Sequence, residues 1–222
     1  MPPRKKKTEK HVGKKTQRKK ATGQSAKGKA KRAQATKRKL LSRLNSRKFR
    51  STHEHTRGVV DWAERLTREL KKTRSKLSVR MVSDAAWLHD IGKLEVNPTH
   101  LNSKKRLSTR EKQHLQEQHV LKVRALLGEV FPTELKEGVL SHHERYDGRG
   151  YPLGLAGADI PFIGRLLKVA DEFQTKIEQR IFQKKIRDIP EAWNEMIRGK
   201  ENSFDPYIVN ALGRILRRRR WI

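Results

Sequence analysis

Apolar residues recur every three to four positions along most of the chain after residue 50. Val59, Trp62 and Leu66 follow this spacing, and Val82 and Ala86 continue it in the next segment, as expected for helices that bury one face. No stretch shows convincing alternation of apolar and polar residues. The pattern therefore predicts an all-α domain of about seven helices. The expected helices span residues 51–73, 78–91, 108–128, 132–144, 159–182, 188–199 and 204–219.

Local signals support several helix ends. Ser108 can cap the third helix, and Asp205, which precedes a proline, can cap the last. Pro132 can open the fourth helix. Gly92 can end the second helix.

The first 50 residues differ from the rest in charge. They hold 21 Lys and Arg and one acid, Glu9, whereas the remaining residues hold 33 basic and 23 acidic side chains. Few apolar residues interrupt this charge, so self-repulsion predicts disorder. We therefore expect a disordered basic tail at residues 1–50 and a helical domain at 51–222, with a short basic helix at 37–49 before the boundary.

Composition limits the classes of site and of location. The chain has no Cys, which excludes disulfides and thiolate metal sites, so any metal must be held by His and carboxylate. No apolar run approaches the ~20 residues that span a bilayer, and the N-terminus lacks a secretory signal. We therefore expect a cytoplasmic protein without membrane contact.

The lysine-rich tail also suggests a partner. Such segments bind polyphosphates through counterion release, without reading sequence. This predicts nonspecific contact of residues 1–50 with DNA, RNA or another polyanion, and association with the nucleoid or the ribosome.

Adjacent polar pairs mark the candidate chemistry. His89 and Asp90 stand at a helix end after an apolar run, where unpaired polar side chains are costly. A metal ion would satisfy both, and the divergence of adjacent residues suits two ions roughly 3.5–4 Å apart with Asp90 as the bridge. His142 and His143 precede a glycine-rich turn and fit the same arrangement. Any one of these histidines alone is more often a packed or solvated residue than a metal ligand, so a metal site is indicated only by the set.

Two motifs carry a family resemblance. The segments "HDIGK" at 89–93 and "HHERYDGRGYP" at 142–152 occur in this order about 50 residues apart. They resemble the HD-GYP group of the HD-domain metal-dependent phosphohydrolases, and the resemblance runs from about residue 51 to 212. It implies an HD/PDEase-like all-α fold. It also implies hydrolysis of the bacterial second messenger cyclic di-GMP as part of signal transduction, with the choice between the linear dinucleotide and GMP as final product left open.

The resemblance also implies roles for individual residues. Lys93 would face the scissile phosphate, Asp90 would be catalytic as well as a ligand, and Arg180 would bind phosphate. The implied metal ligands are His55, His89, Asp90, His119, His142, His143 and Asp171.

The turn after the histidine pair offers two further candidates. Tyr151 could present an aromatic face to a base of the substrate. Glu144 could orient one of the ligand histidines as a hydrogen-bond partner.

The chain departs from the family pattern at two positions. Members with three metals carry a Glu where this chain has Ser51, and Glu54 lies on a different helical face. We therefore expect two divalent transition-metal ions rather than three, Fe or Mn first, with Ni and Zn also compatible with His and Asp ligands. Gln183 stands where a basic phosphate contact is usual, which leaves the exact nucleotide open.

These residues predict an enzyme. A hydroxide that bridges two divalent ions can attack phosphorus near neutral pH, while Lys93 neutralises charge on the phosphoryl oxygens. Two alternatives remain open at this point. One is a module that binds a cyclic dinucleotide or nucleic acid without catalysis, and the other is a phosphohydrolase of the same chemistry that acts on another nucleotide.

Overall fold

The computed structural model describes residues 9–73, 76–96, 109–182 and 188–222, with side chains described outside 9–25, 109–117 and 179–182. Within these ranges the chain is helical and has no strand, apart from one isolated bridge between Lys200 and Phe204. The all-α expectation is confirmed. The α-helices are α1 (Glu9–Leu44), α2 (Arg50–Leu70), α3 (Val79–Leu88), α5 (Thr109–Leu127), α6 (Thr133–Leu140), α7 (Phe162–Phe182), α8 (Ile189–Arg198) and α9 (Pro206–Arg218). Three short 3₁₀ segments join them, η1 (Arg47–Phe49), η2 (Ile91–Glu95) and η3 (Gly157–Asp159).

Helices α2 to α9 correspond to the seven predicted from the sequence, but three of them end three or four residues earlier than expected, among them α2, which ends at Leu70 instead of residue 73. The helix predicted to reach residue 91 ends at Leu88, and the one predicted to reach residue 144 ends at Leu140. Ser141 helps to stop α6, because its hydroxyl donates to Glu137 O at 2.7 Å and competes with the helical backbone for that acceptor. These early ends place the histidine motifs in turns.

The residues predicted to begin or end helices do not all take the expected role in the structure. The carboxylate of Asp205 accepts from the backbone N–H of Tyr207 at 2.8 Å, so its capping role is confirmed. Pro132 occupies the N-cap of α6. Gly92 lies inside η2 rather than at the end of α3. Ser108 falls outside the described residues.

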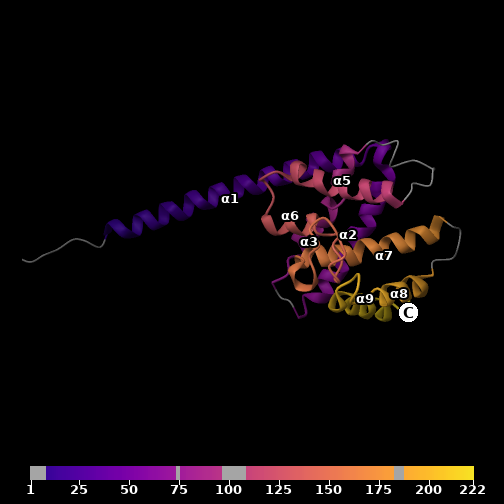
Figure 1. The fold of residues 1–222 in the computed structure, drawn as a ribbon. Helices are drawn as coiled ribbons and strands as arrows, with labels where there is room; N and C mark the ends of the chain where they lie inside the picture. The colour runs from indigo at the N-terminus through magenta and orange to yellow at the C-terminus, as the bar shows by residue number, and fades with distance from the viewer. Residues whose placement is uncertain (1–8, 74–75, 97–108, 183–187) are drawn as a thin grey trace, which may run out of the picture.

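Helix α2 lies at the centre of the domain and packs against α3, α7 and α9 (Figure 1). Its apolar stripe is fully buried, as Val59, Ala63 and Leu66 show. Trp62 meets Phe173 of α7 edge to face, with ring centroids 4.7 Å apart, a favourable aromatic geometry. This packing sets α2 and α7 side by side, and both helices carry predicted ligands.

The structure differs from the expected tail at residues 1–50. Residues 9–44 form α1, whose N-terminal part extends away from the domain (Figure 1). Its C-terminal part joins the core, because Leu40 is 5% exposed and Leu44 is fully buried. The side chain of Lys37 also forms an ion pair with Asp84 of α3. The domain core therefore begins before residue 51, at about Ala33.

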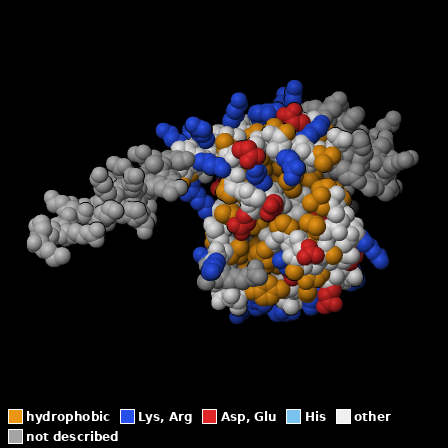
Figure 2. All heavy atoms as spheres, turned by 60° about the vertical axis from the view of Figure 1, so that its left-hand side comes forward, with side chains coloured by type: hydrophobic (Ala, Val, Ile, Leu, Met, Phe, Trp, Pro, Cys, Tyr) orange, Lys and Arg blue, Asp and Glu red, His pale blue; other side chains and the backbone are white. Residues whose placement is uncertain are grey.

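The basic composition of α1 hides this anchoring in the sequence. Leu40 and Leu44 are spaced by one helical turn and form a narrow apolar stripe on a highly charged helix. Lys and Arg side chains project from the described part of α1 and from neighbouring surface in Figure 2. In the described ranges, no helix is both long and apolar enough to cross a membrane.

Candidate metal centre

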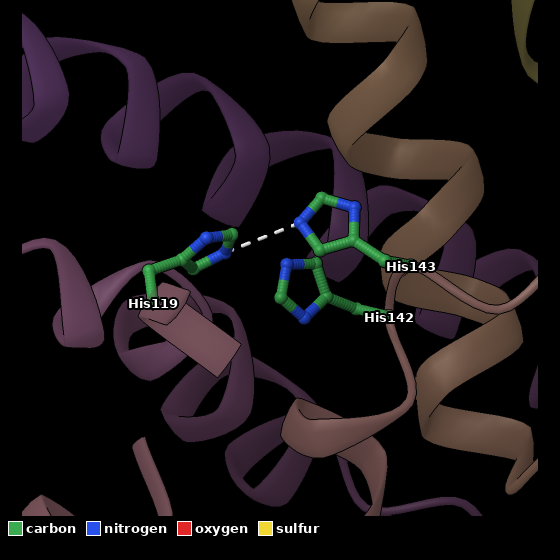
Figure 3. A group of neighbouring side chains, drawn as sticks. All are labelled: His119, His142 and His143. Atoms are coloured by element: carbon green, nitrogen blue, oxygen red, sulfur yellow. Dashed lines mark hydrogen bonds between the residues drawn. The ribbon is translucent and has the colours of Figure 1, made fainter. Parts of the chain in front are cut away.

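Six side chains gather into two groups, each able to hold a metal ion. One group comprises His55 from α2, His89 from the end of α3 and Asp171 from α7. The other comprises His119 from α5 with His142 and His143 from the turn after α6, which converge in Figure 3. Within each group the ligand atoms lie within 4.8 Å of one another.

Asp90 lies between the two groups. Its Oδ2 is 3.3 Å from His89 Nε2 in the first group, and its Oδ1 is 3.5 Å from His119 Nε2 in the second. The side chain is almost completely buried. One carboxylate therefore faces both groups, as a ligand shared by two ions would. All seven ligands predicted from the sequence come together at this place.

His89 and His142 point the same nitrogen into the centre. The Nδ1–H of His89 donates to Ala86 O at 2.7 Å, and that of His142 donates to Val139 O at 2.6 Å. Each hydrogen bond fixes the tautomer that leaves the lone pair on Nε2. Both Nε2 atoms are buried and have no hydrogen-bond partner among the described residues. Because an unpartnered buried acceptor is costly, these residues fit metal ions as their missing partners.

His55 is held from both sides. Its Nε2 lies 2.9 Å from Asp171 Oδ1, and its Nδ1 lies 2.8 Å from Glu178 Oε2. Burial by itself would lower the pKa of His55, but these two hydrogen bonds outweigh it and raise the pKa to about 10. Gln174 donates in turn to the second oxygen of Glu178. His55 is thus oriented by a carboxylate that leaves its Nε2 beside the other ligands of the first group.

Sequence reasoning missed Glu178. It lies seven residues after Asp171 in α7, which is about two helical turns, so both residues project from one face. That spacing is the signal that could have found it.

The charge states of Asp90 and His142 suit metal binding. Burial would raise the pKa of Asp90, but Lys93 and His89 hold it well below its usual range, so the carboxylate is ionised. Burial, with the neighbouring His89 and His119, lowers the pKa of His142 to about 3, so its ring is neutral near pH 7. Ionised carboxylates and neutral imidazoles are the forms that bind metal ions.

Gly92 lets α5 approach the HDIGK segment. A Cβ placed on Gly92 would lie 1.8 Å from the carbonyl oxygen of His119, so any side chain at this position would push the two segments apart. The absence of a side chain at Gly92 therefore allows His119 to lie close to Asp90.

The turn after His143 is itself firmly built. Arg145 makes two hydrogen bonds to the carboxylate of Asp147, at 3.0 and 2.6 Å, and a third to Ser203 Oγ. A Cβ on Gly150 would lie 2.2 Å from Arg145 N, so the turn folds closely back on itself. Glycine is required here because the two backbone segments touch.

Two candidates from this turn have contacts that were not anticipated. Glu144 accepts from Leu153 N at 2.7 Å, so its described hydrogen bond holds the turn rather than a histidine. Tyr151 stacks on His143, with ring centroids 4.8 Å apart and planes inclined by 21°. One face of Tyr151 thus covers a predicted ligand, while the residue also lines the cavity over the centre.

That cavity has a volume of about 490 Å³ and opens over both groups. Lys93 lines it and lies 2.5 Å from Asp90 Oδ2. The remaining lining residues are His55, Asp90, His119, His143, Tyr151, Lys168, Asp171, Glu172, Thr175 and Glu178.

The other residues singled out by the motif pattern lie outside this cavity or outside the described residues. Ser51 is exposed in the first turn of α2. Glu54 is exposed and pairs with Arg50 at 3.0 Å, so it faces away from the centre. Arg180 belongs to α7, but its side chain is not among those described, and Gln183 falls outside the described residues.

Comparison with known proteins agrees with these features. The chain is similar to a cyclic di-GMP phosphodiesterase of Thermotoga maritima, with 31% identity over 175 residues, which are 78% of this chain and 46% of that protein. It is also similar to 3'3'-cGAMP-specific phosphodiesterase 1 of Vibrio cholerae, with 33% identity over 149 residues, 65% of this chain and 33% of that protein. The chain thus spans less than half the length of each of these relatives.

A solved structure shares the fold. It is that of the cyclic GMP-AMP specific phosphodiesterase V-cGAP3 of Vibrio cholerae, with a TM-score of 0.55 and 19% identity, and the match covers 76% of this chain and 45% of that one. The family model described as HD domain matches residues 33–208, a range that includes the end of α1 as well as the centre. The chain therefore belongs to the HD-domain family, as its HD-GYP motifs predicted.

Proposed function

We propose that this protein is a metal-dependent phosphodiesterase that hydrolyses a cyclic dinucleotide, with cyclic di-GMP as the first candidate. The observation that carries the proposal is the position of Asp90 between two His-containing groups, beside Lys93 and under an open cavity. Relatives named for the hydrolysis of cyclic di-GMP and of 3'3'-cGAMP support this substrate class.

The side chains of the centre would have different roles in the reaction. The first group, with Asp171, and the second group, with His119, would each hold one divalent ion, and Asp90 would face both. When bound, such ions supply a water that is nucleophilic at neutral pH and offset negative charge on the phosphoryl oxygens. The protein's own contribution is to orient the ligands and to place the ammonium of Lys93 where that charge develops.

We further propose two ions rather than three. The structure offers two groups of ligand atoms among the described residues, and neither Ser51 nor Glu54 contributes to them. Imidazole and carboxylate ligands are compatible with Fe, Mn, Ni and Zn, and Fe or Mn is our first choice.

Metal analysis combined with a nucleotide panel tests this function. The purified full chain is expected to carry about two transition-metal ions and to cleave cyclic di-GMP or a related cyclic dinucleotide, whereas Asp90→Ala abolishes turnover. Asp61→Ala is a matched control, because Asp61 is exposed on α2 and pairs only locally with Arg65 at 2.7 Å. Metal-free protein that binds the nucleotide intact would support the non-catalytic module instead, and turnover of only another nucleotide would support the third possibility.

We also propose that α1 contacts a polyanion such as DNA or RNA. Residues 1–25 carry ten Lys and Arg and one acid, and residues 26–44 carry eight Lys and Arg and no acid, a composition that binds phosphate chains in a salt-dependent way. Removal of residues 1–25 tests this without disturbing Leu40 and Leu44. The shortened chain is expected to keep its turnover of a cyclic dinucleotide and to bind DNA more weakly at low salt. Unchanged DNA binding at every salt concentration would contradict the proposal.

A further inference from the structure

Helix α7 presents one polar face to the cavity over the centre. Lys168, Asp171 and Thr175 line the cavity at successive helical turns, together with Glu172 and Glu178. Asp171 belongs to the first ligand group, whereas Lys168 lies one turn before it and belongs to neither group. The polar face therefore extends one helical turn before Asp171, where it carries the cation of Lys168.

The side chain of Lys168 is held close to the protein. It is 11% exposed, and its Nζ donates to Glu172 Oε1 at 2.9 Å. Most ion pairs of this i,i+4 kind lie on exposed helix faces and contribute little to stability. The pair of Lys168 and Glu172, in contrast, lines the cavity that also contains predicted metal ligands, so the charge of Lys168 can act on what the cavity binds.

The chemistry of a cyclic dinucleotide requires more than one cation. The ring contains two phosphodiester groups, each with one negative charge, and only one of them can occupy the reaction centre beside Lys93. The other phosphate must lie elsewhere in the same cavity, where a charge-assisted hydrogen bond would stabilise it. Among the described residues that line the cavity, Lys93 and Lys168 are the two Lys or Arg side chains.

We propose that Lys168 binds the phosphate that is not cleaved, and thereby selects a substrate with two phosphodiester groups. Glu172 keeps the ammonium at the cavity edge before substrate arrives. Lys168 is a specificity-determining residue in this scheme, because it does not touch the reacting phosphorus. The inference rests on the proposed function, since it assumes that the substrate is a cyclic dinucleotide.

The test compares two substrates on the metal-loaded full chain. Cyclic di-GMP carries two phosphodiester groups, and bis(p-nitrophenyl) phosphate carries one. The variants are Lys168→Met, which removes the charge, and Lys168→Arg, which keeps it. Lys176→Met is the matched control, because Lys176 lies on the same helix but pairs with Glu195 of α8 at 2.8 Å and does not line the cavity.

The quantity that decides is the ratio of kcat/KM for cyclic di-GMP to kcat/KM for bis(p-nitrophenyl) phosphate. In Lys168→Met this ratio is expected to fall about tenfold, mainly through a higher KM for the cyclic substrate, as loss of a binding contact predicts. Lys168→Arg is expected to restore the ratio to within about threefold, and Lys176→Met to leave it at the original value. The metal content of each variant, measured in parallel, is expected to stay at about two ions.

A ratio that stays within about twofold of the original in Lys168→Met would overturn the inference, as would an equal loss with both substrates, which would assign Lys168 to the centre itself. Failure of the proposed function looks different. In that case the unmodified chain would cleave bis(p-nitrophenyl) phosphate but neither cyclic di-GMP nor 3'3'-cGAMP, and the inference would fall with it.

Discussion

His55 and Glu178 form a partly buried pair that joins α2 to α7, with Nδ1 and Oε2 2.8 Å apart. The carboxylate accepts the hydrogen on Nδ1 and therefore fixes the ring so that Nε2 faces Asp171. Loss of the carboxylate that holds the second ring nitrogen of a metal-binding histidine commonly lowers metal affinity by about 10- to 100-fold. The pair links the packing of two helices to the geometry of the first ligand group.

Glu178→Ala should therefore weaken metal binding. We expect the affinity for one of the two ions to fall about tenfold or more, because the His55 ring loses its orientation. Titration of the metal-free protein with Mn²⁺ measures this directly. Glu178→Gln keeps an acceptor oxygen and is expected to recover most of the affinity. Glu54→Gln is the control, since Glu54 is next to His55 in sequence but exposed, and an equal effect of this control would remove the specific role of Glu178.

Gly92→Ala should separate α5 from the HDIGK segment. The added Cβ would lie 1.8 Å from His119 O, so the backbone must move, at a cost of about 1–3 kcal/mol or more in unfolding free energy. Urea denaturation measures the loss, and metal analysis should show weaker binding by the second group. Gly28→Ala is the control, because nothing lies within 4 Å of a Cβ at that position. Normal stability and metal content of Gly92→Ala would contradict the close approach.

Glu69 should make stability depend on acidic pH. Burial would raise its pKa, but hydrogen bonds from Arg218, Lys72 and Arg214 lower it to about 2. Because the pKa in the folded protein is below the ordinary value of 4.5, the stabilisation is present above pH 4.5 and is lost as pH falls toward 2. The cationic partners are themselves half exposed to solvent, so we expect only about 1–2 kcal/mol from the cluster.

The variant Glu69→Gln tests whether the stabilisation from Glu69 is present at neutral pH and lost in acid. At pH 7 the variant should unfold about 1–2 kcal/mol more easily than the original chain, and the difference should shrink steadily below pH 4.5. Urea unfolding at several pH values gives both curves. A difference that stays constant down to pH 2.5 would show that the lost contribution is not electrostatic.

Leu44→Ala should destabilise the whole domain although it lies in a segment rich in Lys and Arg. Its side chain is fully buried in the core, and truncation of such a leucine costs about 2–5 kcal/mol. Leu121→Ala is the control, because Leu121 is 61% exposed and its loss should change stability by less than about 0.5 kcal/mol. If the two variants unfold alike, α1 does not belong to the folded domain.

Much of this architecture was predictable because helices and ligands leave local signals. The spacing of Val59, Trp62 and Leu66 indicates a buried helical face, which the structure contains. The two histidine motifs led to the residues that gather around Asp90. Their role as metal ligands stays a prediction, which metal titration can test.

The remaining features depend on tertiary packing. The charge of residues 1–50 favoured a disordered tail, yet two leucines one turn apart suffice to dock the end of α1 once the domain offers an apolar surface. Lys168 and Glu178 were missed for another reason. Each is unremarkable in sequence, and only the rotation of α7, which is set by its packing against α2, turns that face toward the cavity.

The hydrogen bonds from His89 and His142 to carbonyls three residues earlier also help to close the ends of α3 and α6. Each ring thus has a task in folding that does not depend on catalysis. Substitution of either histidine would therefore disturb a helix end as well as the metal centre, whereas the described contacts of Asp90 are with Lys93, His89 and His119 inside the centre itself.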